Sequence, residues 1–178
     1  MNHIVVIGFM GSGKTRVGKR LAQDLDLPFI DLDKAIVKKM NMSIAELLDK
    51  FGDPYYRALE TVLIKELAQD KEKKVISVSS ALPAQKQNAE FIPKMGTVVY
   101  LKASFATIRK RLEGNESLAK DPVEWSEKMQ KLLKQRDPIY AGFADITVVT
   151  GEKPFDDLIA EIEQKLSEKT VEKNNDVL

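Results

Sequence analysis

Residues 8–15 read Gly-Phe-Met-Gly-Ser-Gly-Lys-Thr and fit the pattern G-x-x-x-x-G-K-[ST] of a phosphate-binding loop. Glycines let the backbone curl tightly around an anion because they carry no Cβ atom, and the loop amides then point at the phosphates. In such loops the lysine reaches the β- and γ-phosphates of a nucleotide, and the final hydroxyl binds Mg²⁺. The nucleotide-binding residues predicted here are Gly11, Ser12, Gly13, Lys14 and Thr15, with Lys14 also catalytic and Thr15 also a metal ligand.

The segments on either side of this loop fit the same interpretation. Residues 4–7 form a short apolar, β-branched run that is typical of a buried strand. After the loop, Val17, Leu21 and Leu25 recur at helical spacing. Strand, glycine-rich loop and helix are the three parts that this motif needs. The alternative, a chance glycine-rich turn, is much less consistent with these flanks.

Apolar runs that alternate with helical periodicity predict an α/β fold. The five strand candidates are residues 4–7, 28–31, 75–78, 97–101 and 145–149. Such alternation indicates a three-layer α/β/α domain whose five-stranded parallel sheet is covered on both faces. We expect one domain over residues 1–168 and a disordered polar tail over 169–178. The polar segment 113–124 is either a lid over the bound nucleotide or a surface loop.

Composition narrows the range of partners. The 178 residues include 28 basic and 27 acidic side chains, so no field of one sign favours nucleic acid or an anionic membrane. The chain has no cysteine, and it opens directly on a strand candidate without a leader pattern. We therefore expect a cytoplasmic protein that acts on a small molecule and binds neither nucleic acid nor a membrane.

Two carboxylates follow the second strand candidate at a spacing of two residues. Asp31 is placed to hold Mg²⁺ beside the phosphates, and Asp33 to orient an acceptor hydroxyl and take its proton. The alternative is an ordinary strand end followed by an acidic helix N-terminus. From the residues alone, both interpretations stay open.

Several motifs, in order along the chain, resemble the shikimate kinase family. They are the loop at 8–15 with Val17-Gly18, Phe-Ile-Asp-Leu-Asp at 29–33, Met-Ser-Ile-Ala-Glu at 42–46, Tyr-Arg-Ala-Leu-Glu at 56–60, Val-Tyr-Leu at 99–101, Arg-Asp-Pro-Ile-Tyr at 136–140 and Ala-Asp-Ile-Thr-Val at 144–148. The resemblance covers residues 4 to 166. It implies a monomeric P-loop enzyme with a nucleoside monophosphate kinase-like fold, which transfers the γ-phosphoryl group of ATP, with Mg²⁺, to a hydroxyl of a small carboxylated cyclic alcohol. That alcohol would be shikimate, an intermediate of aromatic amino-acid biosynthesis.

The resemblance also implies roles for particular residues. Asp33, Arg57 and Arg136 correspond to acceptor-binding residues, and a guanidinium suits the acceptor carboxylate because it pairs with both oxygens. Arg111 and Pro154 correspond to the pair that encloses adenine. Each arginine also has a plainer interpretation: an ion pair with Glu60 for Arg57, a solvated helix end for Arg136 and a solvated helix face for Arg111.

The sequence departs from the family pattern in two places. Three glycines that line the acceptor pocket in the family are replaced by Ser79, Ser80 and Ala81, so we expect a reshaped pocket in which Ser79 and Ser80 contact the acceptor. An arginine of the family's lid corresponds to Leu118, which cannot neutralise phosphate. Lys120, two residues on, is the candidate to replace it as a catalytic charge.

Three functions are therefore weighed from the sequence. The first is an ATP-dependent kinase that phosphorylates shikimate. The second is a diverged kinase that phosphorylates a different small polyol, and the third is a nucleotide-binding regulatory protein without turnover. The intact loop, Asp31 and Asp33 favour catalysis, whereas the two departures favour the alternatives.

Overall fold

The computed structural model describes residues 3–114 and 120–175, with side chains described as far as residue 171. The strands are β1 (His3–Ile7), β2 (Phe29–Asp31), β3 (Val75–Ser77), β4 (Gly96–Ala103) and β5 (Ile146–Thr150). The helices are α1 (Lys14–Asp24), α2 (Leu32–Met40), α3 (Ile44–Phe51), α4 (Asp53–Gln69), α5 (Lys86–Ala89), α6 (Ile92–Met95), α7 (Phe105–Arg111), α9 (Pro122–Phe143) and α10 (Phe155–Asn175), with a 3₁₀ turn, η1, at Leu82–Ala84.

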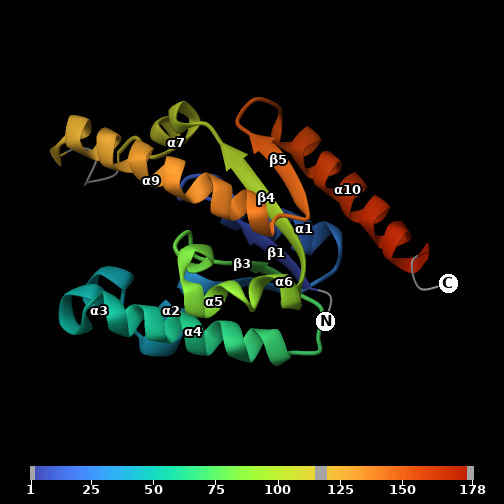
Figure 1. Ribbon diagram of the computed structural model, residues 1–178, viewed down its shortest axis with the longest axis horizontal. Helices are drawn as coiled ribbons and strands as arrows, with labels where there is room; N and C mark the ends of the chain where they lie inside the picture. Colours follow the sequence, from blue (N-terminus) through green and yellow to red (C-terminus); the bar gives the residue numbers. More distant parts are fainter. Residues whose placement is uncertain (1–2, 115–119, 176–178) are drawn as a thin grey trace.

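The five strands form one parallel sheet in the order β2-β3-β1-β4-β5, which confirms the predicted fold class. The β1 strand lies at the centre, paired on one side with β3 and on the other with β4 (Figure 1). Each of the five strand predictions corresponds to an observed strand to within two residues. Because the strands are parallel, the loops that follow them gather at one edge of the sheet, where ligands of such folds bind.

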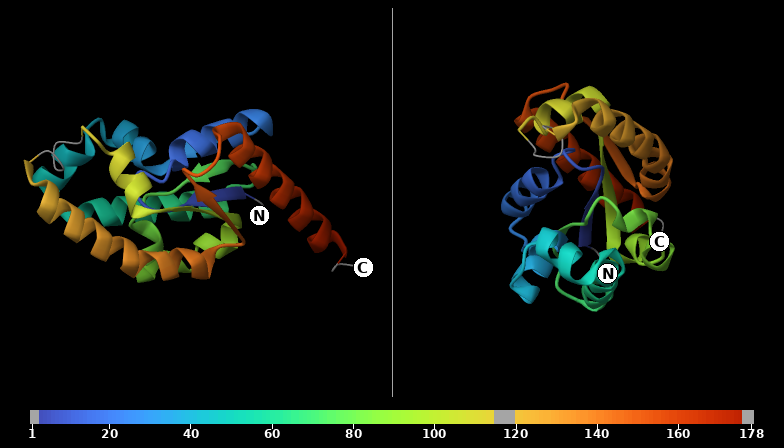
Figure 2. Two further views of the ribbon diagram at one scale, coloured as in Figure 1. Left: turned by 90° about the horizontal axis from the view of Figure 1, so that it is seen from above. Right: turned by 90° about the vertical axis from the view of Figure 1, so that its left-hand side faces the viewer.

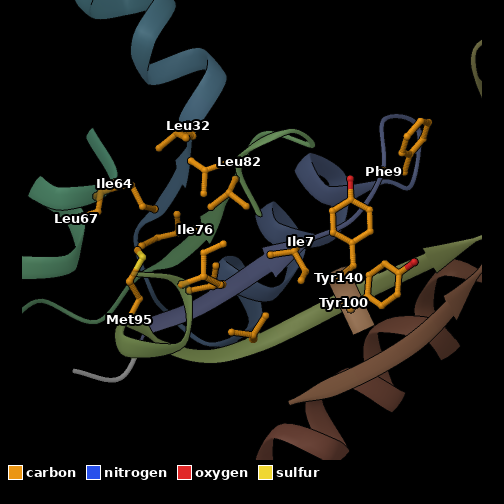
Figure 3. Packing of buried hydrophobic residues seen from close by; sticks show 14 of the residues in the cluster. Ile7, Phe9, Leu32, Ile64, Leu67, Ile76, Leu82, Met95, Tyr100 and Tyr140 are labelled. Atoms are coloured by element: carbon orange, nitrogen blue, oxygen red, sulfur yellow. The ribbon is translucent and has the colours of Figure 1, made fainter. Parts of the chain in front are cut away.

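Helices cover both faces of the sheet and bury two apolar cores. One core joins β1, β3 and β4 to α4, α6 and α9, and the side chains of Ile7, Ile76 and Leu82 lie within it (Figure 3). The other packs Val6, Val17 and Leu158, with their neighbours, between the sheet and the pair α1 and α10. In the view from above, α1 and α9 lie on opposite sides of the strands (Figure 2).

The helix α10 extends further than the sequence predicts. It continues through residues 169–175, which we expected to belong to a disordered tail, while 176–178 lie outside the described residues. Lys169 forms an ion pair with Asp145 at 2.8 Å, and Thr170 donates to the Leu166 carbonyl one turn earlier. The ion pair ties the helix to the residue before β5, beyond the end of its apolar stripe.

The single histidine is a buried structural residue at the start of β1. His3 is buried, its Nε2 lies 3.1 Å from the Leu67 carbonyl, and the Lys74 amide donates to its Nδ1 at 3.2 Å. The ring therefore joins β1 to the segment between α4 and β3. In residues 3–114 and 120–175, no helix combines the length and the apolar character needed to cross a membrane.

Candidate active site

The loop between β1 and α1 has the shape that binding an anion requires. Gly8, Gly11 and Gly13 have φ angles of 150°, 73° and 100°, values that side-chain-bearing residues rarely adopt. A Cβ atom on Gly8 would lie 2.7 Å from the Leu101 carbonyl oxygen. The Ser12 hydroxyl is buried and has no hydrogen-bond partner among the described residues. A cradle of glycines with an unpaired hydroxyl inside it fits a bound phosphate.

Lys14 lies folded over this loop. Its Nζ donates to the carbonyl oxygens of Gly8 at 3.0 Å and Phe9 at 3.1 Å. Burial lowers the pKa of Lys14 to about 8, an effect that the nearby charges of Asp33 and Asp31 oppose. The side chain is thus a partly desolvated cation held between the loop and two carboxylates, where an incoming phosphate would gain most from it.

Thr15 and Asp31 meet at the carboxyl edge of the sheet. The Thr15 hydroxyl donates to Asp31 Oδ2 at 2.6 Å, while Asp31 Oδ1 accepts from the Lys34 amide and caps α2. Asp31 therefore ends a strand and caps a helix, as the plainer interpretation expected, and it lies beside the phosphate loop; its role as a metal ligand stays a prediction. Among the described residues no three His, Cys, Asp or Glu side chains gather as a metal cage. One hydroxyl and one carboxylate suit Mg²⁺, which keeps water and phosphate oxygens as its other ligands.

Asp33 lies in the first turn of α2, beside the same edge. Its Oδ1 accepts a hydrogen bond of 2.7 Å from the hydroxyl of Tyr56, which comes from α4. Burial raises the pKa of Asp33, and the Tyr56 hydrogen bond opposes that rise. No pattern in the sequence indicates this contact, because a tyrosine at 56 fits the apolar face of a helix.

Arg57 is held by carboxylates of its own helix. It pairs with Asp53 Oδ1 at 2.9 Å and with Glu60 Oε2 at 2.9 Å, so the ion pair that the spacing offered as an alternative role is present. Glu60 is fully buried and also accepts from the Ser79 hydroxyl and, at 2.6 Å, from the Gln85 amide. Glu60 and Gln85 were not among the predicted site residues.

The loop after β3 is not strained by the residues that replace glycine. Among the described residues, Asp26 and Asn41 are the only non-glycine residues with positive φ, so Ser79, Ser80 and Ala81 adopt ordinary backbone angles. Ser79 is buried against Glu60, whereas Ser80 is half-buried and its hydroxyl lies 3.5 Å from Arg136. The two serines therefore have different surroundings.

Arg136, on α9, has fewer carboxylate partners than Arg57, the other arginine predicted to bind the acceptor. Besides Ser80, its guanidinium lies 5.9 Å from the centre of the Phe9 ring. No described carboxylate forms an ion pair with it, in contrast to Arg57. The Ser80 carbonyl accepts from the Tyr140 hydroxyl at 2.6 Å, which fixes the loop against α9.

Of the two residues predicted to enclose adenine, Arg111 contacts the phosphate loop, and no described contact brings Pro154 to it. Arg111 donates to the carbonyl oxygens of Gly11 and Ser12, both at 3.0 Å, and to the Thr150 hydroxyl. Pro154 is exposed, and its carbonyl accepts from Leu158 in the first turn of α10. Arg16 lies with its guanidinium 3.9 Å over the Phe155 ring, which accounts for the position of a cation so close to the loop.

A cavity opens beside the phosphate loop on the side of α2. It has a volume of about 420 Å³, within the range of small-molecule sites. Its lining includes Thr15, Asp31, Asp33, Lys34, Val37, Lys38 and Ile44. Hydroxyl, carboxylate and ammonium groups thus converge on a space that adjoins the loop.

The comparisons with known proteins agree with this geometry. A family model described as shikimate kinase matches residues 10–167. The chain belongs to the shikimate kinase family. A shikimate kinase of Thermodesulfovibrio yellowstonii is 36% identical over 96% of this chain and 100% of its own length, and one of Dictyoglomus turgidum is 35% identical over 90% and 94%. The solved structure of shikimate kinase from Acinetobacter baumannii in complex with shikimate covers 95% of this chain and 94% of its own, with 32% identity and a TM-score of 0.85.

Membership of the shikimate kinase family makes the chain a kinase, as the sequence predicted. The lid position that departs from the family pattern, Leu118, lies outside the described residues. Lys120 follows that gap, is exposed and comes immediately before Asp121, which caps α9. No described contact brings Lys120 to Lys14, so its catalytic role stays a prediction.

Proposed function

We propose that the protein transfers the γ-phosphoryl group of ATP to a hydroxyl of shikimate, with Mg²⁺ as its metal. The observation that carries the proposal is the junction of Thr15 with Asp31 at 2.6 Å beside Lys14, with Asp33 two residues further on in the first turn of α2. This junction puts a phosphate cradle, a pair of oxygen ligands and a general-base candidate at one edge of the sheet. The matches to shikimate kinases over most of their length support the choice of acceptor.

The proposed division of labour follows from the chemistry of each group. Gly11, Ser12 and Gly13 cradle the phosphates, and Arg111 and Pro154 bind the adenine. Lys14 stabilises charge on the transferred phosphoryl group, with Lys120 as a second cation. Mg²⁺, held by Thr15 and Asp31, would shield the phosphate charges. Asp33 accepts the proton of the acceptor hydroxyl while the oxygen of that hydroxyl bonds to the γ-phosphorus and ADP leaves.

We further propose that Arg136 binds the acceptor carboxylate, with Arg57 beside it. Arg136 is half-buried and has no described carboxylate partner, so it has the larger gain from an anionic ligand. Ser80 is the serine whose hydroxyl lies on this side, next to Arg136. Ser79 donates its hydroxyl to Glu60, and we assign it an indirect role in shaping the pocket.

Measuring ADP release from purified protein with ATP, Mg²⁺ and shikimate tests this function. Turnover on shikimate that the Lys14→Ala variant lacks would support it. Turnover on another compound from a panel of small polyols would instead favour a diverged kinase. The observation that favours this alternative is the half-buried Ser80 hydroxyl beside Arg136, which replaces a family glycine. Nucleotide binding without turnover on any acceptor would point to a regulatory protein. We also propose a monomer that works in the cytoplasm, and light scattering after size exclusion measures the first of these.

A further inference from the structure

Two adjacent tyrosines at the start of α4 have opposite surroundings. Tyr55 is exposed, and its ring lies 4.7 Å from that of Phe51. Tyr56 is 4% exposed and packs with Ile36 and Leu47 in a small apolar core between α2, α3 and α4. A buried tyrosine needs a partner for its hydroxyl, and Tyr56 has only one that the structure describes, the Asp33 carboxylate at 2.7 Å.

This contact decides how the Asp33 carboxylate is presented. Its Oδ1 is taken by the Tyr56 hydroxyl, and Oδ2 accepts no described hydrogen bond. The Tyr56 ring is fixed by its packing, so the hydroxyl is a rigid reference point for a side chain that otherwise has free torsions. One carboxylate oxygen is thus pinned and the other is left for a ligand.

The charges around Asp33 give the carboxylate an alternative position. It is attracted to Lys14, while the carboxylates of Asp31 and Glu60 repel it. Without the Tyr56 hydroxyl, this balance would draw Asp33 towards the lysine and away from the acceptor side. The Tyr56 hydroxyl therefore opposes an ion pair between Asp33 and Lys14. Such a pair would take Asp33 away from the acceptor and would neutralise the charge with which Lys14 binds phosphate.

We propose that Tyr56 is a positioning residue for phosphoryl transfer, whose hydroxyl pins Oδ1 of Asp33 so that Oδ2 faces the acceptor. This inference rests on the proposed function. It assigns a role to a residue outside the phosphate loop, whose hydroxyl contacts the proposed base. The i, i+4 partner of Tyr56 on α4 is Glu60, which holds Ser79, so one face of α4 orients both sides of the acceptor pocket.

The Tyr56→Phe variant tests the proposal, because it keeps the ring and removes only the hydroxyl. We expect the KM for the acceptor to rise about tenfold, which is what the loss of one hydrogen bond between the acceptor and the charged Asp33 would cause. We also expect kcat to fall. The dissociation constant for ATP measured without acceptor should change less than twofold. Tyr55→Phe is the control: it removes a tyrosine hydroxyl at the adjacent, exposed position of α4, where no described contact reaches Asp33. It should leave the acceptor KM unchanged.

A double-mutant cycle shows whether Tyr56 acts through Asp33. In an Asp33→Ala background, which leaves no side-chain oxygen for the Tyr56 hydroxyl, Tyr56→Phe should have little further effect on acceptor affinity, measured by calorimetry. Equal effects in both backgrounds, or an unchanged KM in the single variant, would overturn the proposal. A crystal structure of Tyr56→Phe gives a result even if the wild type turns over no acceptor. If Asp33 is turned towards Lys14 in that structure, the positioning role of Tyr56 is supported even where the proposed function has failed. If Asp33 has not moved, the positioning role is refuted.

Discussion

Arg57 donates to Glu60 across 2.9 Å, and the Glu60 carboxylate is completely removed from solvent. A buried carboxylate costs several kcal/mol of desolvation unless it is paired and hydrogen-bonded. Arg57, Ser79 and Gln85 together supply these partners, so Glu60 joins α4 to the loop after β3. Of the two arginines proposed to bind the acceptor, Arg57 therefore also holds a buried charge of the fold, whereas no described carboxylate pairs with Arg136.

Arg57→Ala should therefore damage stability as well as binding. Removing one partner of a buried ion pair leaves the other charge uncompensated, which typically costs about 3 to 5 kcal/mol. Because Arg57 is 28% exposed at its side chain and water can reach the gap, we expect the lower end of that range. Urea unfolding followed by circular dichroism measures it. A variant as stable as the wild type would mean that Glu60 does not depend on Arg57.

Arg136→Ala should have the opposite profile. Since no described carboxylate pairs with Arg136, its removal leaves no charge unpaired, and the unfolding free energy should change by less than about 0.5 kcal/mol. The acceptor KM should rise by about 10- to 100-fold, because a charge-assisted bidentate contact is lost. Steady-state kinetics with ATP at saturation measures the effect. Arg136→Lys should recover only part of it, since an ammonium cannot pair with both oxygens.

Substituting the two serines that replace family glycines should likewise affect different properties: binding for Ser80 and stability for Ser79. Ser80→Gly removes a Cβ and a hydroxyl beside Arg136, and we expect shikimate to bind a few times more tightly, as calorimetry can show. Ser79→Gly removes a donor to buried Glu60, so we expect it to lower the unfolding free energy by about 1 to 3 kcal/mol. If Ser79→Gly changed shikimate affinity and left stability intact, the assignment of the two serines would be reversed.

Local patterns in the sequence were enough for the sheet and for the phosphate loop. The strands are short apolar runs, and the loop is a contiguous motif, so each could be recognised within about ten residues of chain. The pairings around the acceptor pocket could not, because they join distant segments. Tyr56 meets Asp33 and Ser79 meets Glu60 only after α4 has packed across the sheet edge. Arg111 reaches the loop carbonyl oxygens across about 100 residues, and no spacing rule indicates that.

Nucleotide affinity should fall as the pH rises through about 8. The pKa of Lys14 is lowered to about 8, against about 10.4 in an unfolded chain. Between these values the unfolded chain binds more protons than the folded one. The destabilisation caused by the buried ammonium is therefore full below about pH 8, and it declines as the pH rises from about 8 to about 10.4. Phosphates favour the charged form, so ATP binding above pH 8 must take up a proton.

Isothermal titration calorimetry between pH 7.5 and 9.5, in buffers of different ionisation enthalpy, measures that proton uptake. The matched variant is Lys14→Arg, because a guanidinium stays charged throughout this range. Its ATP affinity, whatever its absolute value, should not depend on pH between 7.5 and 9.5. The same pH slope in both proteins would mean that a group other than Lys14 titrates.

Gly96→Ala should be among the most damaging single substitutions in the central sheet. Gly96 pairs with His3 where β4 begins beside β1, and its φ is +154°. A Cβ atom there would lie 2.1 Å from the His3 carbonyl oxygen and 2.5 Å from the His3 nitrogen. Backbone atoms cannot turn aside as a side chain can, so the two strands would have to separate. We expect a loss of at least about 3 kcal/mol of unfolding free energy.

The comparison that makes this prediction sharp is Gly142→Ala. Gly142 lies in the last turn of α9, and a Cβ atom there would meet nothing within 4 Å. Alanine is a better helix former than glycine by about 1 kcal/mol, so the unfolding free energy of this variant should equal or exceed that of the wild type. The two substitutions change the same atom, and urea midpoints measured side by side isolate the effect of position. If Gly96→Ala unfolded at the same urea concentration as Gly142→Ala, the register of β1 against β4, and with it the placing of the phosphate loop after β1, would be wrong.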